Sequence, residues 1–170
     1  QDILEVKAVV RGIHEAFDAT GKVLPIQAQV TLDTTGRMLL GTDIAAALAI
    51  LEGLGIDVIR LNCSTGPDYM RDPIRYLTEH SKLPVSCIPN AGLPLNVDGE
   101  AVYPMKPEPF SKLMLEFVNE YGVRVVGGCC GTREEHIHLI NEGLDRSRPT
   151  PPTPEVEPML ASPVQAVAMQ

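Results

Sequence analysis

Three cysteines in this chain have the spacing and surroundings of a metal site. Cys129 and Cys130 stand together in the segment 125–132, Val-Val-Gly-Gly-Cys-Cys-Gly-Thr, and Cys63 ends a strand-like run that begins at residue 57. Zinc binds thiolates at about 2.3 Å; four protein ligands close a structural site, whereas three leave a position for water or substrate. We therefore predict that Cys63, Cys129 and Cys130 bind one zinc ion, and that this ion activates another thiol.

Three thiolate ligands favour alkylation of a thiol over hydrolysis. They leave the ion electron-rich, so it generates hydroxide poorly but suits a soft thiolate nucleophile. The glycines at 127, 128 and 131 are expected to provide the backbone angles that bring both adjacent side chains to one metal. The alternative is that Cys129 and Cys130 are small buried core residues, as free cysteines often are. Cys87 lies mid-strand without flanking glycines and is predicted to be such a core residue.

The composition is that of an acidic globular chain. Of its 170 residues, 44% are hydrophobic and 21% are charged, which suits one ordinary domain with a core. The net charge of −8 argues against binding to nucleic acid or to an anionic membrane, and no apolar run reaches the roughly 20 residues that span a bilayer. We therefore expect a cytoplasmic protein with reduced thiols. Because the chain begins with Gln1 and not Met, we also expect a fragment or a processed product.

Strand-like and helix-like segments alternate along the chain. The expected helices are 3–19, 44–54, 68–80, 107–121 and 133–144, and the expected strands are 26–32, 57–62, 84–88 and 123–127. This alternation predicts an α/β fold of four parallel strands joined by right-handed crossovers, which is half of a (βα)8 TIM barrel; a small doubly wound sheet is the other option. In either fold, Cys63, Asn90 and the Cys129–Cys130 pair follow the carboxyl ends of strands, where functional residues gather.

Residues outside this pattern have simpler interpretations. The stretch 95–106 is expected to be irregular, and Thr132 is expected to cap the last helix. His136 and His138 lie two positions apart, so they do not share a helix face, and both are predicted to lie on the solvated surface. From 147 to 158 the sequence is proline-dense and predicted to be extended. We therefore divide the chain into a domain at 1–146 and a proline-rich linker toward a following domain at 147–170.

Three short segments resemble the signature blocks of zinc-dependent homocysteine S-methyltransferases. They are Leu-Asn-Cys at 61–63, Pro-Asn-Ala-Gly-Leu-Pro at 89–94 and Gly-Gly-Cys-Cys-Gly-Thr at 127–132, and the resemblance covers about residues 1–146. It implies a (βα)8 barrel, of which this chain would be the C-terminal half. It also implies that Cys63, Cys129 and Cys130 are the zinc ligands and that Asn90 binds the amino-acid end of homocysteine.

Within this family the chain is most similar to the homocysteine-binding domain of the cobalamin-dependent branch. This resemblance implies transfer of a methyl group to homocysteine to form methionine. The implied donor is methylcobalamin, recharged from methyltetrahydrofolate, with the cobalamin and the folate bound by other domains of a larger chain. The alternatives are a homocysteine methyltransferase that uses betaine or S-methylmethionine, and a non-enzymatic scaffold with a structural zinc.

The resemblance also implies that part of the barrel is absent. The family barrel begins well upstream of Gln1, and the acidic residues with which the family binds the substrate match nothing in this sequence. Half a barrel leaves sheet edges and apolar faces uncovered. We therefore expect the chain alone to be inactive, and to be poorly stable or to need the missing N-terminal half-barrel.

Overall fold

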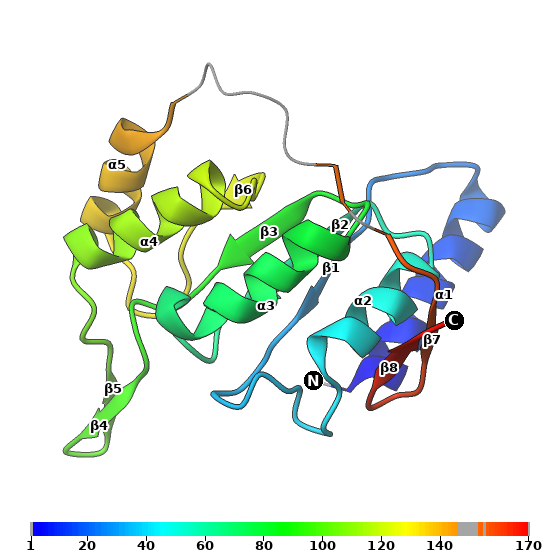
Figure 1. Ribbon diagram of the computed structural model, residues 1–170, viewed down its shortest axis with the longest axis horizontal. Helices are drawn as coiled ribbons and strands as arrows, with labels where there is room; N and C mark the ends of the chain where they lie inside the picture. The colour runs from blue at the N-terminus through cyan, green and yellow to red at the C-terminus, as the bar shows by residue number, and fades with distance from the viewer. Residues whose placement is uncertain (1, 146–152, 155, 170) are drawn as a thin grey trace.

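A four-stranded parallel sheet carries the loops that hold the three cysteines (Figure 1). The computed structural model describes residues 2–145, 153–154 and 156–169. The strands of the sheet are β1 (Gln27–Val30), β2 (Val58–Asn62), β3 (Val85–Ile88) and β6 (Val125–Val126). The helices are α1 (Ile3–Thr20), α2 (Ile44–Glu52), α3 (Pro67–His80), α4 (Pro107–Asn119) and α5 (Glu134–Gly143). The predicted elements are confirmed, although the last strand is shorter than the expected 123–127.

The order of the strands in the sheet, β1-β2-β3-β6, is their order along the chain, and each neighbouring pair is parallel. Right-handed crossovers between strands added in one direction place the connecting helices on one side of the sheet. In agreement, α2 contacts α3, α3 contacts α4, and α4 contacts α5. A doubly wound sheet would reverse this order at a switch point. The sheet is therefore that of part of a (βα)8 barrel, as predicted. No helix of the described residues is long and apolar enough to cross a membrane.

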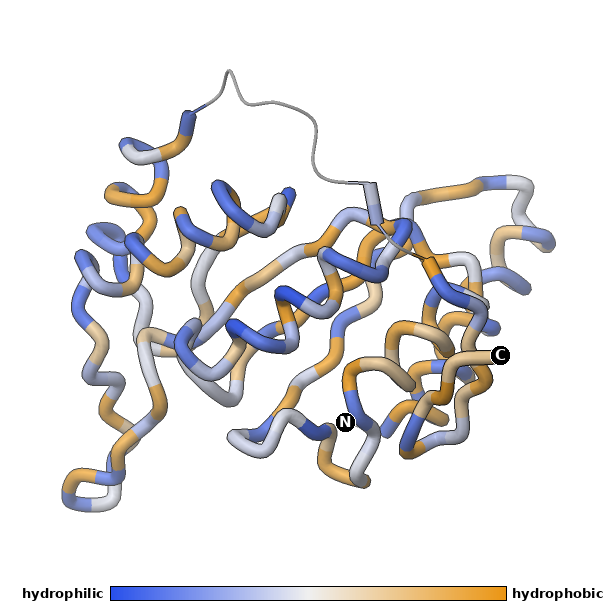
Figure 2. The backbone as a smooth tube through the Cα atoms, viewed as in Figure 1, coloured by the Kyte–Doolittle hydropathy of each residue, from blue (hydrophilic) through white to orange (hydrophobic). Residues whose placement is uncertain are grey.

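Alternate residues of each strand face the helices and form the core. On β2, Ile59 and Leu61 are buried, and Leu61 is in register with the buried Cys87 of β3. These residues belong to one hydrophobic cluster with side chains from all five helices. Helix α2 is apolar over most of its length (Figure 2). It begins where the Asp43 carboxylate accepts a hydrogen bond from the amide of Ala46 at 2.8 Å and so caps the helix.

The other face of the sheet carries polar side chains. Gln29, Arg60 and Ser86 occupy one level of the register across β1, β2 and β3. The Ser86 hydroxyl and the Nε of Arg60 are buried without a hydrogen-bond partner among the described residues. Among the described residues, β1 and β6 form the two edges of this sheet, and each pairs with one neighbouring strand only. In a closed (βα)8 barrel this face lies in the interior and every strand has two neighbours.

A β-hairpin replaces the irregular structure expected at 95–106. Strands β4 (Leu95–Val97) and β5 (Glu100–Val102) pair antiparallel and project from the body of the molecule (Figure 1). The two residues between them, Asp98 and Gly99, both have positive φ, 53° and 89°. This is the arrangement of a type I′ turn, for which Asp-Gly is a favoured pair. The expectation of irregular structure was therefore wrong, because this turn signal outweighed the lack of a clear hydrophobic pattern.

A second hairpin lies in the predicted linker. Strands β7 (Met159–Ala161) and β8 (Ala166–Ala168) contact α2, and the amide of Asp43 donates a hydrogen bond to the carbonyl oxygen of Val164 at 3.0 Å. Residues 147–152 and 155 of the proline-rich stretch at 147–158 lie outside the described residues, so its extended conformation stays a prediction. The division of the chain into 1–146 and 147–170 likewise stays a prediction.

Candidate metal centre

Three loops meet at the carboxyl edge of the sheet and bring the candidate residues together. Cys63 follows β2, Asn90 follows β3, and the Cys129–Cys130 pair follows β6. Backbone hydrogen bonds join these loops. Two of them join the loop after β3 to the loop after β6: the amide of Cys129 donates to the oxygen of Pro89 (2.7 Å), and the amide of Ala91 donates to the oxygen of Cys130 (2.9 Å). Two others join the end of β3 and its loop to the loop after β2: the amide of Asn90 donates to the oxygen of Thr65 (3.0 Å), and the amide of Cys63 donates to the oxygen of Ile88 (3.1 Å). The predicted convergence of residues that are distant in the sequence is therefore present.

The three sulfurs form a compact triangle. The Sγ of Cys130 lies 3.8 Å from the Sγ of Cys63 and 3.8 Å from the Sγ of Cys129, and all three lie within 4.8 Å of one another. These side chains are half-buried, whereas Cys87 is fully buried with its sulfur 3.8 Å from that of Met70. The structure thus confirms that Cys87 is a core residue and contradicts the alternative that Cys129 and Cys130 are core residues.

The dimensions of this triangle suit a metal ion. Sulfurs bound at about 2.3 Å in tetrahedral directions around zinc stand about 3.8 Å apart. Among the described residues, no histidine, aspartate or glutamate joins the three cysteines as a fourth candidate ligand. The triad could therefore hold a metal ion and leave one position for another group.

The chain reaches this geometry through an unusual backbone conformation at Cys63. The φ angles of Cys63 and Ser64 are 58° and 65°, in the left-handed region that residues other than glycine rarely adopt. Such a conformation costs about 1–2 kcal/mol per residue. The amide of Thr65 donates to the carbonyl oxygen of Cys63 at 2.8 Å and closes the turn. The sequence carried no signal for this turn, because neither residue is a glycine or an asparagine.

The glycines around the Cys129–Cys130 pair, called the doublet below, mainly leave space for neighbouring side chains. Of the three, only Gly131 has a positive φ, 75°. A Cβ on Gly128 would lie 2.4 Å from the Thr132 side chain, and one on Gly127 would lie 2.9 Å from the Ile88 side chain. The expectation that all three supply unusual backbone angles was therefore wrong for Gly127 and Gly128, where a neighbouring side chain lies close to the position that a Cβ would take.

Asn90 lies next to the doublet and is 1% exposed. Its side-chain oxygen accepts a hydrogen bond from the amide of Cys130 at 3.1 Å, which fixes the backbone that carries one candidate ligand. The carboxamide also has two N–H donors. Its contact with the amino-acid end of a substrate stays a prediction.

Comparison with known proteins places the chain in a family. The sequence model described as Homocysteine S-methyltransferase matches residues 1–144. The chain belongs to this family. It is 44% identical to a methionine synthase of Mycobacterium leprae (strain TN) over 146 residues, which are 86% of this chain and 12% of that protein. It is 46% identical to a methionine synthase of Mycobacterium tuberculosis (strain ATCC 25618 / H37Rv) over 140 residues, which are 82% of this chain and 12% of that protein. The chain thus spans 12% of the length of these relatives.

The thiols of this homocysteine S-methyltransferase chain differ in their affinity for protons. Burial, reinforced by hydrogen bonds with Cys130 and Cys63, raises the pKa of Cys129 to about 11. A hydrogen bond from Tyr103 lowers the pKa of Cys130 below its ordinary value of 9.0. Three thiolates in contact repel one another. All three cysteines can therefore lose their protons together only when a cation binds between them. The triangle is therefore chemically suited to a divalent metal.

Two residues near the site were missed or misplaced by sequence reasoning. Tyr103, which follows β5, interacts with Cys130, but it lies in the stretch expected to be irregular and had no signal of its own. His136 was predicted to be exposed and is in fact 4% exposed; its Nδ1 accepts from the amide of Arg133 (3.2 Å), and its Nε2 pairs with the oxygen of Met105 (3.1 Å). Its neighbour on the helix, His138, is exposed as predicted and pairs with Glu142.

Thr132 also differs from its predicted role. Its hydroxyl donates a hydrogen bond to the carbonyl oxygen of Cys129 at 2.7 Å, and α5 begins two residues later, at Glu134. Thr132 therefore holds the turn of the cysteine doublet and does not cap the helix.

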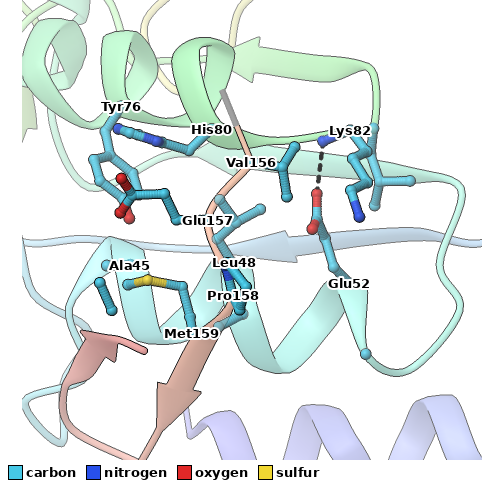
Figure 3. Close-up of a pocket in the computed structure, with 14 residues that line it drawn as sticks. Ala45, Leu48, Glu52, Tyr76, His80, Lys82, Val156, Glu157, Pro158 and Met159 are labelled. Atoms are coloured by element: carbon cyan, nitrogen blue, oxygen red, sulfur yellow. Dashed lines mark hydrogen bonds between the residues drawn. The ribbon is translucent and has the colours of Figure 1, made fainter. Parts of the chain in front are cut away.

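A cavity of about 750 Å³ lies elsewhere, between α2, α3 and the segment 156–159 (Figure 3). Leu48 and Glu52 of α2 line one side, and Tyr76 and His80 of α3 line the other. His80 is the last residue of α3, just before the amino end of β3, whereas the cysteines follow the carboxyl ends of strands. This cavity is therefore not part of the candidate metal centre.

Proposed function

We propose that Cys63, Cys129 and Cys130 hold a zinc ion at which the thiol of homocysteine is activated for methyl transfer, as part of a methionine synthase. The observation that carries this proposal is the sulfur triangle, in which the Sγ of Cys130 lies 3.8 Å from that of its neighbour Cys129 and 3.8 Å from that of Cys63 in a distant loop. Membership of the homocysteine S-methyltransferase family and 44–46% identity to methionine synthases support the substrate and the reaction.

The residues of the chain would act as follows. Zinc, when bound, lowers the pKa of a coordinated thiol, so that homocysteine reacts as a thiolate at neutral pH. The three cysteines would hold the ion and leave one position for the substrate sulfur. Asn90 would keep Cys130 in place through the hydrogen bond to its amide and would bind the amino-acid end of homocysteine with its N–H donors. The substrate thiol would release its proton to solvent, its sulfur would form a bond to the methyl carbon, and the donor would keep the electron pair of the bond that breaks.

The methyl donor in this proposal is methylcobalamin, recharged from methyltetrahydrofolate. Both cofactors would be bound by other domains of a longer chain. The identity to methionine synthases, of which this chain spans 12%, supports a multidomain enzyme of this kind. Betaine and S-methylmethionine are the competing donors, and a donor assay on the complete enzyme separates the three.

The rest of the barrel would cover the polar face of the sheet. The unpaired Ser86 hydroxyl, the unpaired Nε of Arg60 and the open edges of β1 and β6 support a further half-barrel packed there. In the proposal that half also supplies the acidic side chains that bind the substrate amine, so the present chain alone would not turn over. The four free thiols support a reducing, cytoplasmic compartment.

The metal content of the purified chain tests this proposal. We expect one zinc per chain for the natural sequence and for the control variant Cys87→Ala, which removes a buried thiol away from the site. We expect loss of zinc from Cys63→Ala, Cys129→Ala and Cys130→Ala. Zinc retained at one per chain in the variant with all three changes would contradict the proposal.

A further inference from the structure

A buried histidine on α5 bonds to two separate segments of the chain. The Nδ1 of His136, which is 4% exposed, accepts a hydrogen bond from the amide of Arg133 at 3.2 Å, and its Nε2 lies 3.1 Å from the carbonyl oxygen of Met105. An amide can only donate and a carbonyl oxygen can only accept, so the ring is neutral with its proton on Nε2. The ring of Phe110 on α4 meets it edge to face, with the ring centres 5.2 Å apart. His136 therefore holds the first turn of α5 and the segment 103–106 together.

The segment 103–106 is in turn bonded to the loop after β3. It connects the β4–β5 hairpin to α4, and α4 packs against α5 (Figure 1). The amide of Met105 donates to the carbonyl oxygen of Ala91 at 2.9 Å, and the amide of Ala91 donates to that of Cys130, also at 2.9 Å. Gly92 lets the two segments approach closely, because a Cβ there would lie 3.0 Å from the Cβ of Met105. The loop after β3 thus lies between the doublet and the segment that His136 holds.

These bonds form a closed ring that begins and ends next to the doublet. The carbonyl oxygen of Cys130 accepts from Ala91, and the backbone of Ala91 bonds to that of Met105. The oxygen of Met105 bonds to His136, whose ring bonds to the amide of Arg133, three residues after Cys130. Every other hydrogen-bonding group of the ring belongs to the backbone, which any residue but proline provides in full. The residue type at position 136 therefore decides whether the ring closes.

We propose that His136 is a positioning residue of the metal centre, which holds Cys130 against the loop after β3 before any metal binds. This inference rests on the zinc site proposed above. The carbonyl of Cys130 is bonded within the ring and its amide is bonded to the Asn90 side chain at 3.1 Å, so both polar backbone groups of this candidate ligand are fixed. A ligand held in this way loses less freedom when the ion binds, which tightens binding. His136 acts through the backbone and is not itself one of the candidate ligands.

Three substitutions in the full chain test this role. Glutamine at the third helical position can accept from the N-cap amide and donate through its NH2 group, so His136→Gln should keep both bonds. Asparagine can replace the acceptor but is too short to reach Met105, so His136→Asn should open the ring. His14→Asn is the matched control. The Nε2 of His14 also pairs with a carbonyl oxygen, that of Leu54 at 2.8 Å, but this contact joins α1 to the segment before β2.

Four measurements are made on each variant. Zinc affinity is measured by competition with a chromophoric chelator under reducing conditions, and the geometry of the site is read from the ligand-field bands of the Co²⁺-loaded chain. Amide hydrogen exchange at Ala91 and Met105, followed by NMR on the metal-free chain, reports on the ring without any metal. Thermal unfolding gives the loss of overall stability.

We expect His136→Asn to lower zinc affinity by about tenfold and to speed exchange at the two amides by a similar factor. The Co²⁺ bands should change as well, because one of the three sulfurs is no longer held in place. His136→Gln should restore the natural values. His14→Asn should lower thermal stability and leave zinc affinity, the Co²⁺ bands and the exchange of these two amides unchanged.

Two results would overturn the role of His136. One is an equal loss of zinc affinity in His136→Asn and His14→Asn, and the other is unchanged Co²⁺ bands and amide exchange in His136→Asn, because His136 would then only stabilise the fold. If the natural chain binds no metal, the zinc proposal itself fails. In that case unchanged exchange in His136→Asn overturns the present inference too, whereas faster exchange supports the part of it that concerns the position of Cys130.

Discussion

The amide of Cys130 donates a hydrogen bond of 3.1 Å to the side-chain oxygen of Asn90, a residue 40 positions earlier in the chain. This bond joins the loop after β3 to the loop after β6 and fixes the backbone of one corner of the sulfur triangle. Asn90 therefore serves the architecture of the site, whatever contact it makes with a substrate.

The first prediction concerns this hydrogen bond. Asn90→Ala removes the acceptor and leaves the partly buried amide of Cys130 unpaired, which should lower the free energy of unfolding by about 1–3 kcal/mol and weaken zinc binding. Asn96→Ala is the matched control, because Asn96 also accepts a hydrogen bond from a backbone amide, that of Gly99, but in the exposed hairpin. Chemical denaturation and zinc titration measure both effects. Equal losses in the two variants would contradict a special role for Asn90.

The second prediction separates crowding from backbone strain at two glycines. Gly131 and Gly99 both have positive φ, 75° and 89°, but a Cβ on Gly99 has nothing within 4 Å, whereas one on Gly131 meets Tyr103. Gly99→Ala should therefore cost about 1–2 kcal/mol of stability, and Gly131→Ala should cost about 1–3 kcal/mol more. Gly131→Ala should also impair metal binding. A smaller stability loss in Gly131→Ala than in Gly99→Ala would show that Tyr103 does not pack on this turn.

The third prediction concerns the polar face of the sheet. The Ser86 hydroxyl is fully buried and unpaired among the described residues, so Ser86→Ala should raise the stability of this chain by about 1 kcal/mol. Ser111→Ala is the control, because the Ser111 hydroxyl, also buried, donates to the oxygen of Glu108 at 3.0 Å. That change should lower stability by about 0.5–1.5 kcal/mol. Urea denaturation measures both variants, and destabilisation by Ser86→Ala would mean that its hydroxyl has a partner in solution.

The fourth prediction is a loss of stability of the metal-free chain in alkali. Burial raises the pKa of Cys87, and burial with neighbouring thiols raises that of Cys129 to about 11, against an ordinary value of 9.0. A raised pKa means that the folded state favours the neutral thiol. The contribution of these thiols to the free energy of unfolding is therefore complete below pH 9 and is lost as the pH rises toward 11 and beyond. Cys130, whose pKa is lowered, acts in the opposite sense and offsets part of the loss.

Denaturation of the chelator-treated chain between pH 8 and pH 11 measures this effect. The variant Cys129→Ala should lose less stability over that range than the natural chain. Zinc affinity should change in the other direction and increase with pH, because the cysteines must release protons to bind the metal. A stability curve that stays level above pH 9 in the natural chain would refute the assignment of these shifts.

The sequence was sufficient to predict the elements of the sheet and the convergence of the cysteines. Glycine and proline residues mark the ends of the apolar segments, and the carboxyl ends of parallel strands meet at one edge. Cys63, Asn90 and the doublet could therefore be placed together although they lie far apart in the sequence.

The remaining details of the site depend on contacts that no local pattern encodes. Tyr103 packs against Gly131 beside the cysteine pair, and His136 pairs with the oxygen of Met105 two residues after Tyr103, so these contacts join three separate segments. The left-handed backbone at Cys63 is likewise imposed by the loop around it and not by its residue type. The β4–β5 hairpin is a different case, because Asp98-Gly99 was a usable turn signal that the prediction did not weigh.

The central claim is that three sulfurs of this chain and one exchangeable group surround a single zinc ion. X-ray absorption at the zinc edge, recorded on the zinc-loaded chain before and after addition of homocysteine, tests it most directly. We predict three sulfurs and one light atom before addition, and four sulfurs afterwards; the variant Cys63→Ala should bind no stoichiometric zinc. Before homocysteine is added, four protein ligands or a sulfur count other than three would contradict the claim.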